Sequence, residues 1–213
     1  MAEQNIPEHE SEGRRSGPVL QLIASGLQFW IRQQCQSVDS LELQLHGSAL
    51  GLLRGRLDGV SLVARRAVFS DLELELVDLR SEAIQVQVGG LLRGQPLKLD
   101  HPFRVDGFVA LSGPGLSRSL STAHWRALGD QLADGLLGLT PLQSVLIERD
   151  RLRLQAQGMT CDTVPEAVDG RLELVHSDNG QRVALPGDPN IRIENANLEG
   201  GLLNLQGSAR VSP

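Results

Sequence analysis

Few residues in this sequence have the types and spacing that catalysis or metal binding needs. The chain contains no GxSxG nucleophile elbow, no HExxH metal motif and no GxGxxG phosphate loop. Its histidines are scattered, at His9, His46, His101, His124 and His176. We therefore predict no catalytic residue, no metal ligand and no cofactor, and a protein that is not an enzyme.

An enzyme acting on lipid is the alternative that these residues leave open. His124, beside Trp125 on a predicted helix, is the histidine expected in a structured pocket, although a lone histidine there is more typical of a helix surface. Glu73 and Glu75 alternate with leucines, as on a solvated sheet face. Catalysis would need a nucleophile and a base brought together from distant positions.

Composition and charge narrow the class of ligand. The 213 residues are 40% apolar and only 3% aromatic, with no tyrosine, and the net charge is -6. A chain that lacks stacking rings and repels phosphate polymers is not expected to bind nucleic acid. All its basic side chains except Lys98 are arginine. Arginine grips phosphate through two hydrogen bonds, but the codon usage of a GC-rich genome gives the same bias.

The cysteines and the N-terminus predict the compartment. Cys35 and Cys161 have no paired spacing, which indicates a reducing environment and leaves open whether they pair. The first residues are acidic rather than basic, unlike a secretory signal, and no apolar run reaches the ~20 residues that cross a bilayer. We expect a cytoplasmic or already processed protein that is peripheral to a membrane.

The hydrophobic period predicts the elements. Residues 1–17 read as a disordered tail, 18–37 as an amphipathic helix, and a second helix is expected to start at Ser121 and stop at Gly138. Alternating segments predict strands, with weaker signals after residue 157. They lie at 41–45, 57–64, 72–76, 84–88, 97–99, 103–110, 145–147 and 152–156, with weak signals at 172–175 and 183–185 and two closing strands at 191–193 and 203–205.

No helix separates most of these strands, so the sheet is predicted to be antiparallel. We expect an α+β fold in which a long curved antiparallel β-sheet wraps around two amphipathic helices as a tube. Residues 158–213 are expected to continue the sheet with long connections. The tube is either filled by the helices, as an ordinary core, or open enough to accept an acyl chain.

One stretch carries a family likeness. The run from Gly47 to Val60, with its GLLRGR segment, resembles the LmeA-like family of phospholipid-binding proteins, and so does the segment from Gly115 to Leu120 with Trp125 beyond it. The resemblance covers residues 18–157 and is closest to the cyanobacterial branch. It implies a tubular lipid-binding fold and a role in holding or moving phospholipid.

From that resemblance and the apolar phase of the elements we derive a candidate site. The lipid-binding side chains are expected to be Leu27, Trp30, Ile31, Leu43, Leu62, Leu74, Val86, Leu120, Trp125, Leu128 and Leu132. The headgroup is expected near Arg54, Arg56 and Arg93.

The expected partners are phospholipid and, transiently, a membrane surface touched by a loop such as 50–53. A protein partner is left unknown. The rival function is a structural or interaction module with a fully packed core and no ligand.

Overall fold

The computed structural model describes residues 18–87 and 98–213, which form an α+β fold dominated by antiparallel strands. The predicted tail lies outside the described residues. The helices are α1 (Pro18–Gln34), α2 (Ala49–Leu53), α3 (Gly113–Ser121) and α4 (Arg126–Leu137). The strands are β1 (Ser37–His46), β2 (Arg56–Leu57), β3 (Gly59–Phe69), β4 (Leu72–Ser81), β5 (Ile84–Gln87), β6 (Lys98–Leu99), β7 (Phe103–Ser112), β8 (Ser144–Glu148), β9 (Arg151–Ala156), β10 (Met159–Val168), β11 (Arg171–His176), β12 (Arg182–Ala184), β13 (Ile191–Glu199) and β14 (Leu202–Val211).

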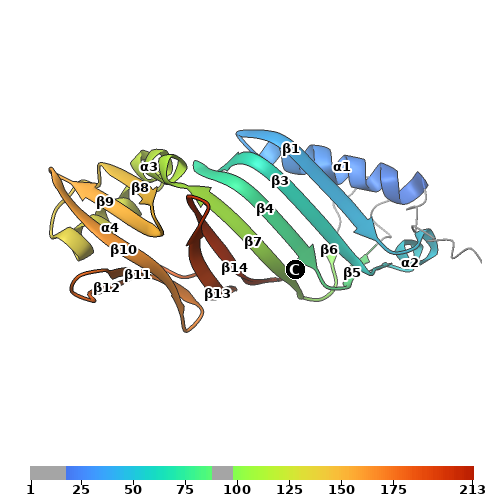
Figure 1. Ribbon diagram of the computed structural model, residues 1–213. Helices are drawn as coiled ribbons and strands as arrows, with labels where there is room; N and C mark the ends of the chain where they lie inside the picture. The colour runs from blue at the N-terminus through green and yellow to red at the C-terminus, as the bar shows by residue number, and fades with distance from the viewer. Residues whose placement is uncertain (1–17, 88–97) are drawn as a thin grey trace, which may run out of the picture.

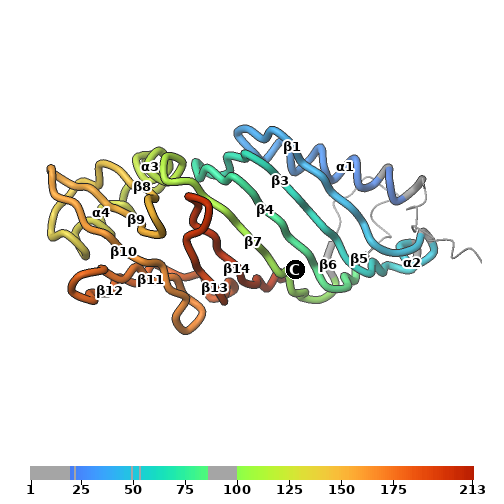
Figure 2. The backbone as a smooth tube through the Cα atoms, viewed as in Figure 1, coloured from blue at the N-terminus to red at the C-terminus, as the bar shows by residue number. Residues whose placement is uncertain are grey.

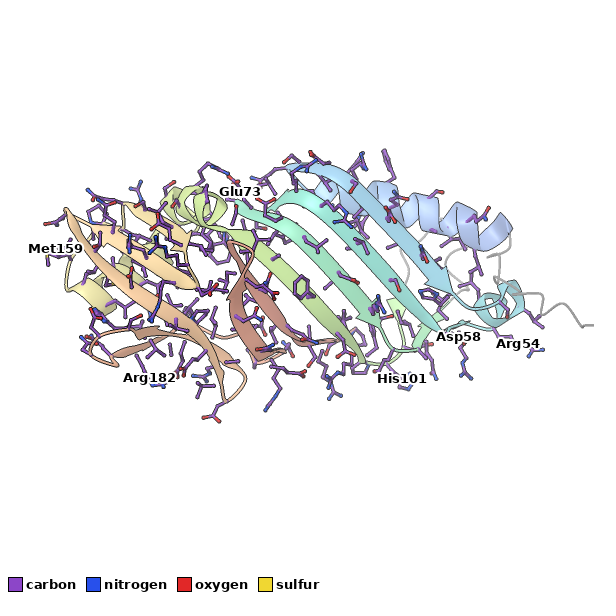
Figure 3. All side chains as sticks on the ribbon, in the orientation of Figure 1. Arg54, Asp58, Glu73, His101, Met159 and Arg182 are labelled. Carbon is purple, nitrogen blue, oxygen red and sulfur yellow. The ribbon has the colours of Figure 1, made fainter. Side chains whose placement is uncertain are left out.

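The strands form three sheets rather than one. Their orders are β1-β3-β4-β7-β14-β13, β12-β11-β10-β9-β8 and β2-β5-β6. Figure 1 shows the six-stranded sheet with α1 in one half of an elongated molecule, and the five-stranded sheet with α3 and α4 in the other. The antiparallel sheet is confirmed, but it is open, and a single sheet wrapped around both helices was the wrong prediction. The helices lie on different sheets because the chain starts a second sheet after α4.

Helix α1 forms where the apolar period predicted it. Leu20, Ile23, Leu27 and Ile31 recur at helical spacing and pack in a cluster with apolar side chains of β1 and β3. The helix ends at Gln34, and β1 begins at Ser37. Its predicted end at residue 37 was therefore three residues too late, because Gln36 N–H already donates to the Val68 carbonyl across the sheet.

The second helical region is two helices. The side chain of Ser112 accepts a hydrogen bond from Gly115 N–H and caps α3, which Ser121 ends rather than starts. The backbone is extended at Thr122, and α4 starts only after Trp125. The predicted cap at Ser121 was therefore wrong. The predicted stop at Gly138 is confirmed, since Gly138 has a φ of 67° that suits glycine.

The last third of the chain divides between the two large sheets. Strands β8 to β12 build the five-stranded sheet, and β13 and β14 return to pair with β7. Strand β10 was not predicted, because its residues carry no clear alternation. Residues 158–213 were expected to continue the first sheet, but of their strands only β13 and β14 do so. Strand β5, which carries Val86, pairs with β2 and β6 instead of joining the main sheet.

Each half has its own apolar core. Leu111, Leu120, Leu132, Leu136 and Leu154 lie in the core between α3, α4 and the five-stranded sheet. A second core lies under α1, and a smaller third cluster continues it along β1, β3 and β4. Partly buried Leu74 and Val109 pack against both the first core and the third cluster, which joins the two halves.

Candidate functional site

An apolar groove lies on the part of the six-stranded sheet that none of the described helices covers. Cross-strand pairing places apolar residues of all six strands on one face, and α1 covers only its β1 side. Beyond α1 the face forms a groove with a volume of about 320 Å³. Its lining is Leu79, Val105, Gly107, Val109, Ile191, Arg192, Ile193, Leu205, Gln206, Gly207, Ser208, Ala209 and Val211.

Two paired glycines hollow the groove. Gly107 of β7 lies opposite Gly207 of β14, so neither strand places a side chain at the centre of this face. A Cβ on Gly207 would lie 2.1 Å from the carbonyl oxygen of Arg192. That close approach follows a β-bulge in β13 between Ile193 and Asn195. Position 207, at the floor of the groove, therefore accepts glycine and no residue with a side chain.

The groove side chains are only half-buried, although they are aliphatic. Val105, Val109, Leu205 and Ala209 all keep part of their surface exposed. The opposite face of the same strands is charged, and there Arg104 Nε lies 2.7 Å from Asp106 Oδ1. The hydrogen bond and charge of Asp106 raise the pKa of Arg104. This half of the sheet thus has one polar face and one apolar face, over which residues 18–87 and 98–213 place no helix.

Arginines lie at the end of the sheet where β4 and β14 finish and β7 and β13 begin. Arg104, Arg192 and Arg210 line a second cavity of about 350 Å³, which shares Ile191, Arg192, Ser208 and Ala209 with the groove. Cross-strand pairing puts these three arginine side chains on the charged face, with Asp106 and Ser208, around the strand ends from the apolar face. Among the residues that the structure describes, no carboxylate pairs with Arg192 or Arg210. Glycine at position 170 lets the stem of Arg192 pass, since a Cβ there would lie 3.0 Å from Arg192 Cγ.

The predicted lipid-binding residues divide between two cores. Leu27, Ile31, Leu43 and Leu62 meet under α1, in the cluster that covers the β1 side of the sheet. The predicted residues of the second helical region pack in the other half, namely Leu120, Trp125, Leu128 and Leu132. The structure does not bring these two groups together. Leu74 packs against the core of the second half and against the third cluster, which also contacts Ile31 and Leu62.

Two predicted residues differ from their expected positions. Trp30 was expected to face the sheet, but its side chain is 60% exposed, because the sheet-facing stripe of α1 runs through Leu27 and Ile31. Val86 was placed beside Leu43 and Leu62, yet its strand belongs to the small three-stranded sheet. Trp125 is anchored, since its Nε1 donates to the Ser70 carbonyl at 2.7 Å.

Two of the predicted headgroup arginines, Arg54 and Arg56, lie outside the groove lining. Arg54 closes α2 and is exposed, and Arg56 faces Asp58 with 3.8 Å between Nε and Oδ1. Arg93 lies outside the described residues. Sequence reasoning did not find Arg192 or the two glycines, because the pairing of β7 with β14 is a contact between distant segments. The alternation in 103–110 and 203–205 was the available signal.

The residues that bear on catalysis do not assemble a site. Within 18–87 and 98–213, no group of three or more His, Cys, Asp or Glu side chains is arranged to hold a metal ion. His124 is exposed, with its ring 5.0 Å from that of Trp125 in an edge-on contact.

None of the helices in residues 18–87 and 98–213 is both long and apolar enough to span a bilayer.

Comparison with known families identifies the relationship. A family model described as LmeA-like phospholipid-binding matches residues 16–211. The chain belongs to the LmeA-like phospholipid-binding family. The match includes β13 and β14, which extend beyond the residues on which the sequence likeness rested. Comparisons with curated proteins and with solved structures gave no match. The LmeA-like family is described by binding phospholipid, not by catalysis.

Proposed function

We propose that this protein binds one phospholipid without catalysing a reaction on it, with an acyl chain in the groove beside α1. The observation that carries the proposal is an aliphatic groove left half-exposed in a chain of a phospholipid-binding family. Aliphatic surface is stabilised by ~25 cal/mol for each Å² removed from water, so a hydrocarbon chain gains free energy on entering.

The size of the groove suits part of a lipid. Ligand pockets commonly span ~300–1,000 Å³, and the groove is at the small end of that range with about 320 Å³. One acyl chain fits along the glycine floor, while the rest of the molecule extends beyond the lining. A protein that leaves part of its lipid outside is suited to exchanging it, and we propose that it carries lipid between membranes or presents it to another protein.

The phosphate of the bound lipid is proposed to lie at the strand ends. Arg192 and Arg210 line the adjoining cavity, and their side chains belong to the charged face, so the phosphate would lie around the strand ends from the acyl chain. Guanidinium groups bind phosphate through charge-assisted hydrogen bonds. Arg54 and Arg56, the headgroup residues proposed from the sequence, are carried by α2 and β2 and are the competing position.

Native mass spectrometry of protein purified without detergent tests lipid binding. We expect a bound phospholipid at one per chain, identified by solvent extraction of the same sample. Replacing Ala209 by tryptophan fills the groove and is expected to lower the lipid-bound fraction at least about tenfold, since burial of one acyl chain is worth several kcal/mol.

The matched control places the same side chain on the other face of the same sheet. Gln44 is exposed on the polar face of β1, so Gln44→Trp should leave the lipid-bound fraction unchanged. A lipid-free mass before and after incubation with liposomes would overturn the proposal. That outcome would favour an interaction module with no ligand.

A further inference from the structure

Half of the aromatic side chains are exposed, in a chain with few of them. The sequence has four phenylalanines, two tryptophans and no tyrosine. Phe29 is 64%, Trp30 60% and Phe69 51% exposed, whereas the other three aromatics are partly buried. Aromatic side chains bury large apolar areas when they pack in a core, so three of them left exposed indicate a contact surface.

The orientation of α1 shows which way Trp30 points. The side-chain amide of Gln28 donates to the Leu41 carbonyl of the edge strand β1, so this side of the helix faces the sheet edge. Residues advance by about 100° each around a helix, which places Trp30 about 200° from Gln28. Trp30 therefore lies on the opposite side of α1, toward the uncovered strands and the groove.

Phe69 lies at the same end of α1. Ile31, in the last turns of the helix, packs against the cluster that contains Ala67. Phe69 is two residues further along β3 and shares the face of Ala67, since side chains alternate along a strand. Neighbouring Val68 accepts a hydrogen bond from Gln36 N–H, just after α1. Phe29 and Trp30 belong to the C-terminal half of α1, and Phe69 to the end of the strand against which Ile31 packs; we name these three exposed side chains the aromatic patch.

The charge of α1, which carries two of the three aromatic side chains, favours a lipid surface over an acidic or basic protein. Helix α1 contains no Asp or Glu, and Arg32 is its one charged residue, whereas the whole chain has a net charge of -6. Tryptophan and phenylalanine insert at the boundary between headgroups and acyl chains, and an amphipathic helix lies flat in that layer. A helix without carboxylates is also not repelled by anionic lipid.

We propose that the aromatic patch docks the protein on a phospholipid bilayer, with Phe29, Trp30 and Phe69 inserted at the level of the headgroups. Docking in this orientation turns the groove side of α1 toward the membrane, so that an acyl chain moves between bilayer and groove with little exposure to water. The inference rests on the proposed lipid binding and adds the surface through which lipid enters.

Tryptophan fluorescence tests the docking directly. In a Trp125→Phe variant, Trp30 is the one tryptophan, and vesicles of phosphatidylglycerol and phosphatidylcholine are added. We expect a blue shift of its emission, and quenching when the acyl chains are brominated near the headgroup. In Trp30→Phe, where Trp125 remains, emission should be unchanged. A Trp30 emission that stays unshifted and unquenched in protein that has bound vesicles would overturn the proposal.

Vesicle flotation gives the second measurement. Combining Phe29→Ser with Trp30→Ser should lower the fraction of protein that floats with vesicles at least about tenfold, since two interfacial aromatics are lost. The matched control is Leu50→Ser, because Leu50 is 57% exposed on α2 and belongs to the loop first expected to touch the membrane. A loss of flotation in the control but not in the aromatic variant would move the docking surface to α2.

Native mass spectrometry of the same variants separates the two proposals. If the patch docks the membrane, protein loaded with lipid during expression should still carry lipid in the Phe29→Ser, Trp30→Ser variant, while its uptake of new lipid from vesicles slows. Loaded wild-type protein that never binds vesicles would refute docking and leave lipid binding intact. Protein that docks but never carries lipid would refute the groove and not the patch.

Discussion

At the scale of single residues, glycine decides the shape of the groove. Gly207 is required by a backbone contact, since its Cβ position is 2.1 Å from one carbonyl oxygen and 3.0 Å from the carbonyl carbon of Arg192. Backbone atoms of a paired strand cannot move aside as the end of a flexible side chain can. Gly26, in α1, has open space at its Cβ position.

The same substitution at these two glycines should therefore have opposite effects on stability. Gly207→Ala forces β13 away from β14 and is expected to lower the free energy of unfolding by at least ~1–3 kcal/mol. Gly26→Ala removes backbone freedom from the unfolded chain and should raise the free energy by ~0.5–1 kcal/mol. Urea unfolding measures both. Equal stability of Gly207→Ala and wild type would contradict the close approach in β13.

At the scale of elements, α3 is held on β4 by polar contacts across the junction of the two halves. Arg118 reaches both carboxylate oxygens of Glu73 at 2.6 Å, and Glu73 N–H donates to the buried Ser119 hydroxyl. Glu75 accepts a hydrogen bond from Ser112. Glu73 and Glu75 were expected on a solvated sheet face. That interpretation was wrong, because α3 lies over this end of β4.

The ion pair predicts a dependence of stability on pH. The hydrogen bond from Arg118 holds the pKa of Glu73 below its usual value. Its stabilising contribution is therefore complete above the ordinary pKa of glutamate and is lost as the pH falls through the lowered value. We expect Glu73→Gln to lower Tm at neutral pH, with a difference from wild type that shrinks on acidification.

Arg118→Gln tests whether the effect belongs to the pair. If it does, the double variant should lose no more Tm than either single variant, since each substitution already breaks the contact. A difference between wild type and Glu73→Gln that stays constant down to acid pH would show that Glu73 acts through something other than its charge.

At the scale of the whole molecule, the turn between β10 and β11 of the five-stranded sheet contacts β13 of the six-stranded sheet next to Arg192. Arg192 belongs to β13, and its stem passes Gly170 in the turn between β10 and β11. Ile193 N–H also donates to the Gly170 carbonyl at 2.9 Å. The five-stranded sheet thus supports the end of the groove where we place the phosphate.

Removing the two arginines should change which lipid is bound more than whether lipid is bound. We expect Arg192→Ala with Arg210→Ala to lower the preference for phosphatidylglycerol over phosphatidylcholine about tenfold, since a hydrogen bond to a charged group is worth ~1.5–3 kcal/mol. Native mass spectrometry with mixed vesicles measures the ratio. Arg54→Ala with Arg56→Ala is the matched control, and a lost preference in that variant alone would place the phosphate near α2.

Local patterns in the sequence determined the elements. The helical period of Leu20, Ile23, Leu27 and Ile31 predicted α1, and alternation predicted most strands, because both periods follow from backbone geometry within one segment. The glycine after Leu137 predicted the end of α4 for the same reason. The segment from Gly47 to Val60 led to the family that comparison then showed.

The tertiary structure decided which faces meet. Nothing local distinguishes a strand that continues the first sheet from one that starts a second, and so the placement of β5, β10 and β13 could not be predicted. The exposure of Trp30 likewise depends on how α1 is turned against the sheet, with Leu27 and Ile31 facing it. The groove exists because β14 pairs with β7 beyond the reach of α1, a contact about 100 residues apart whose energy comes from burial rather than from either segment alone.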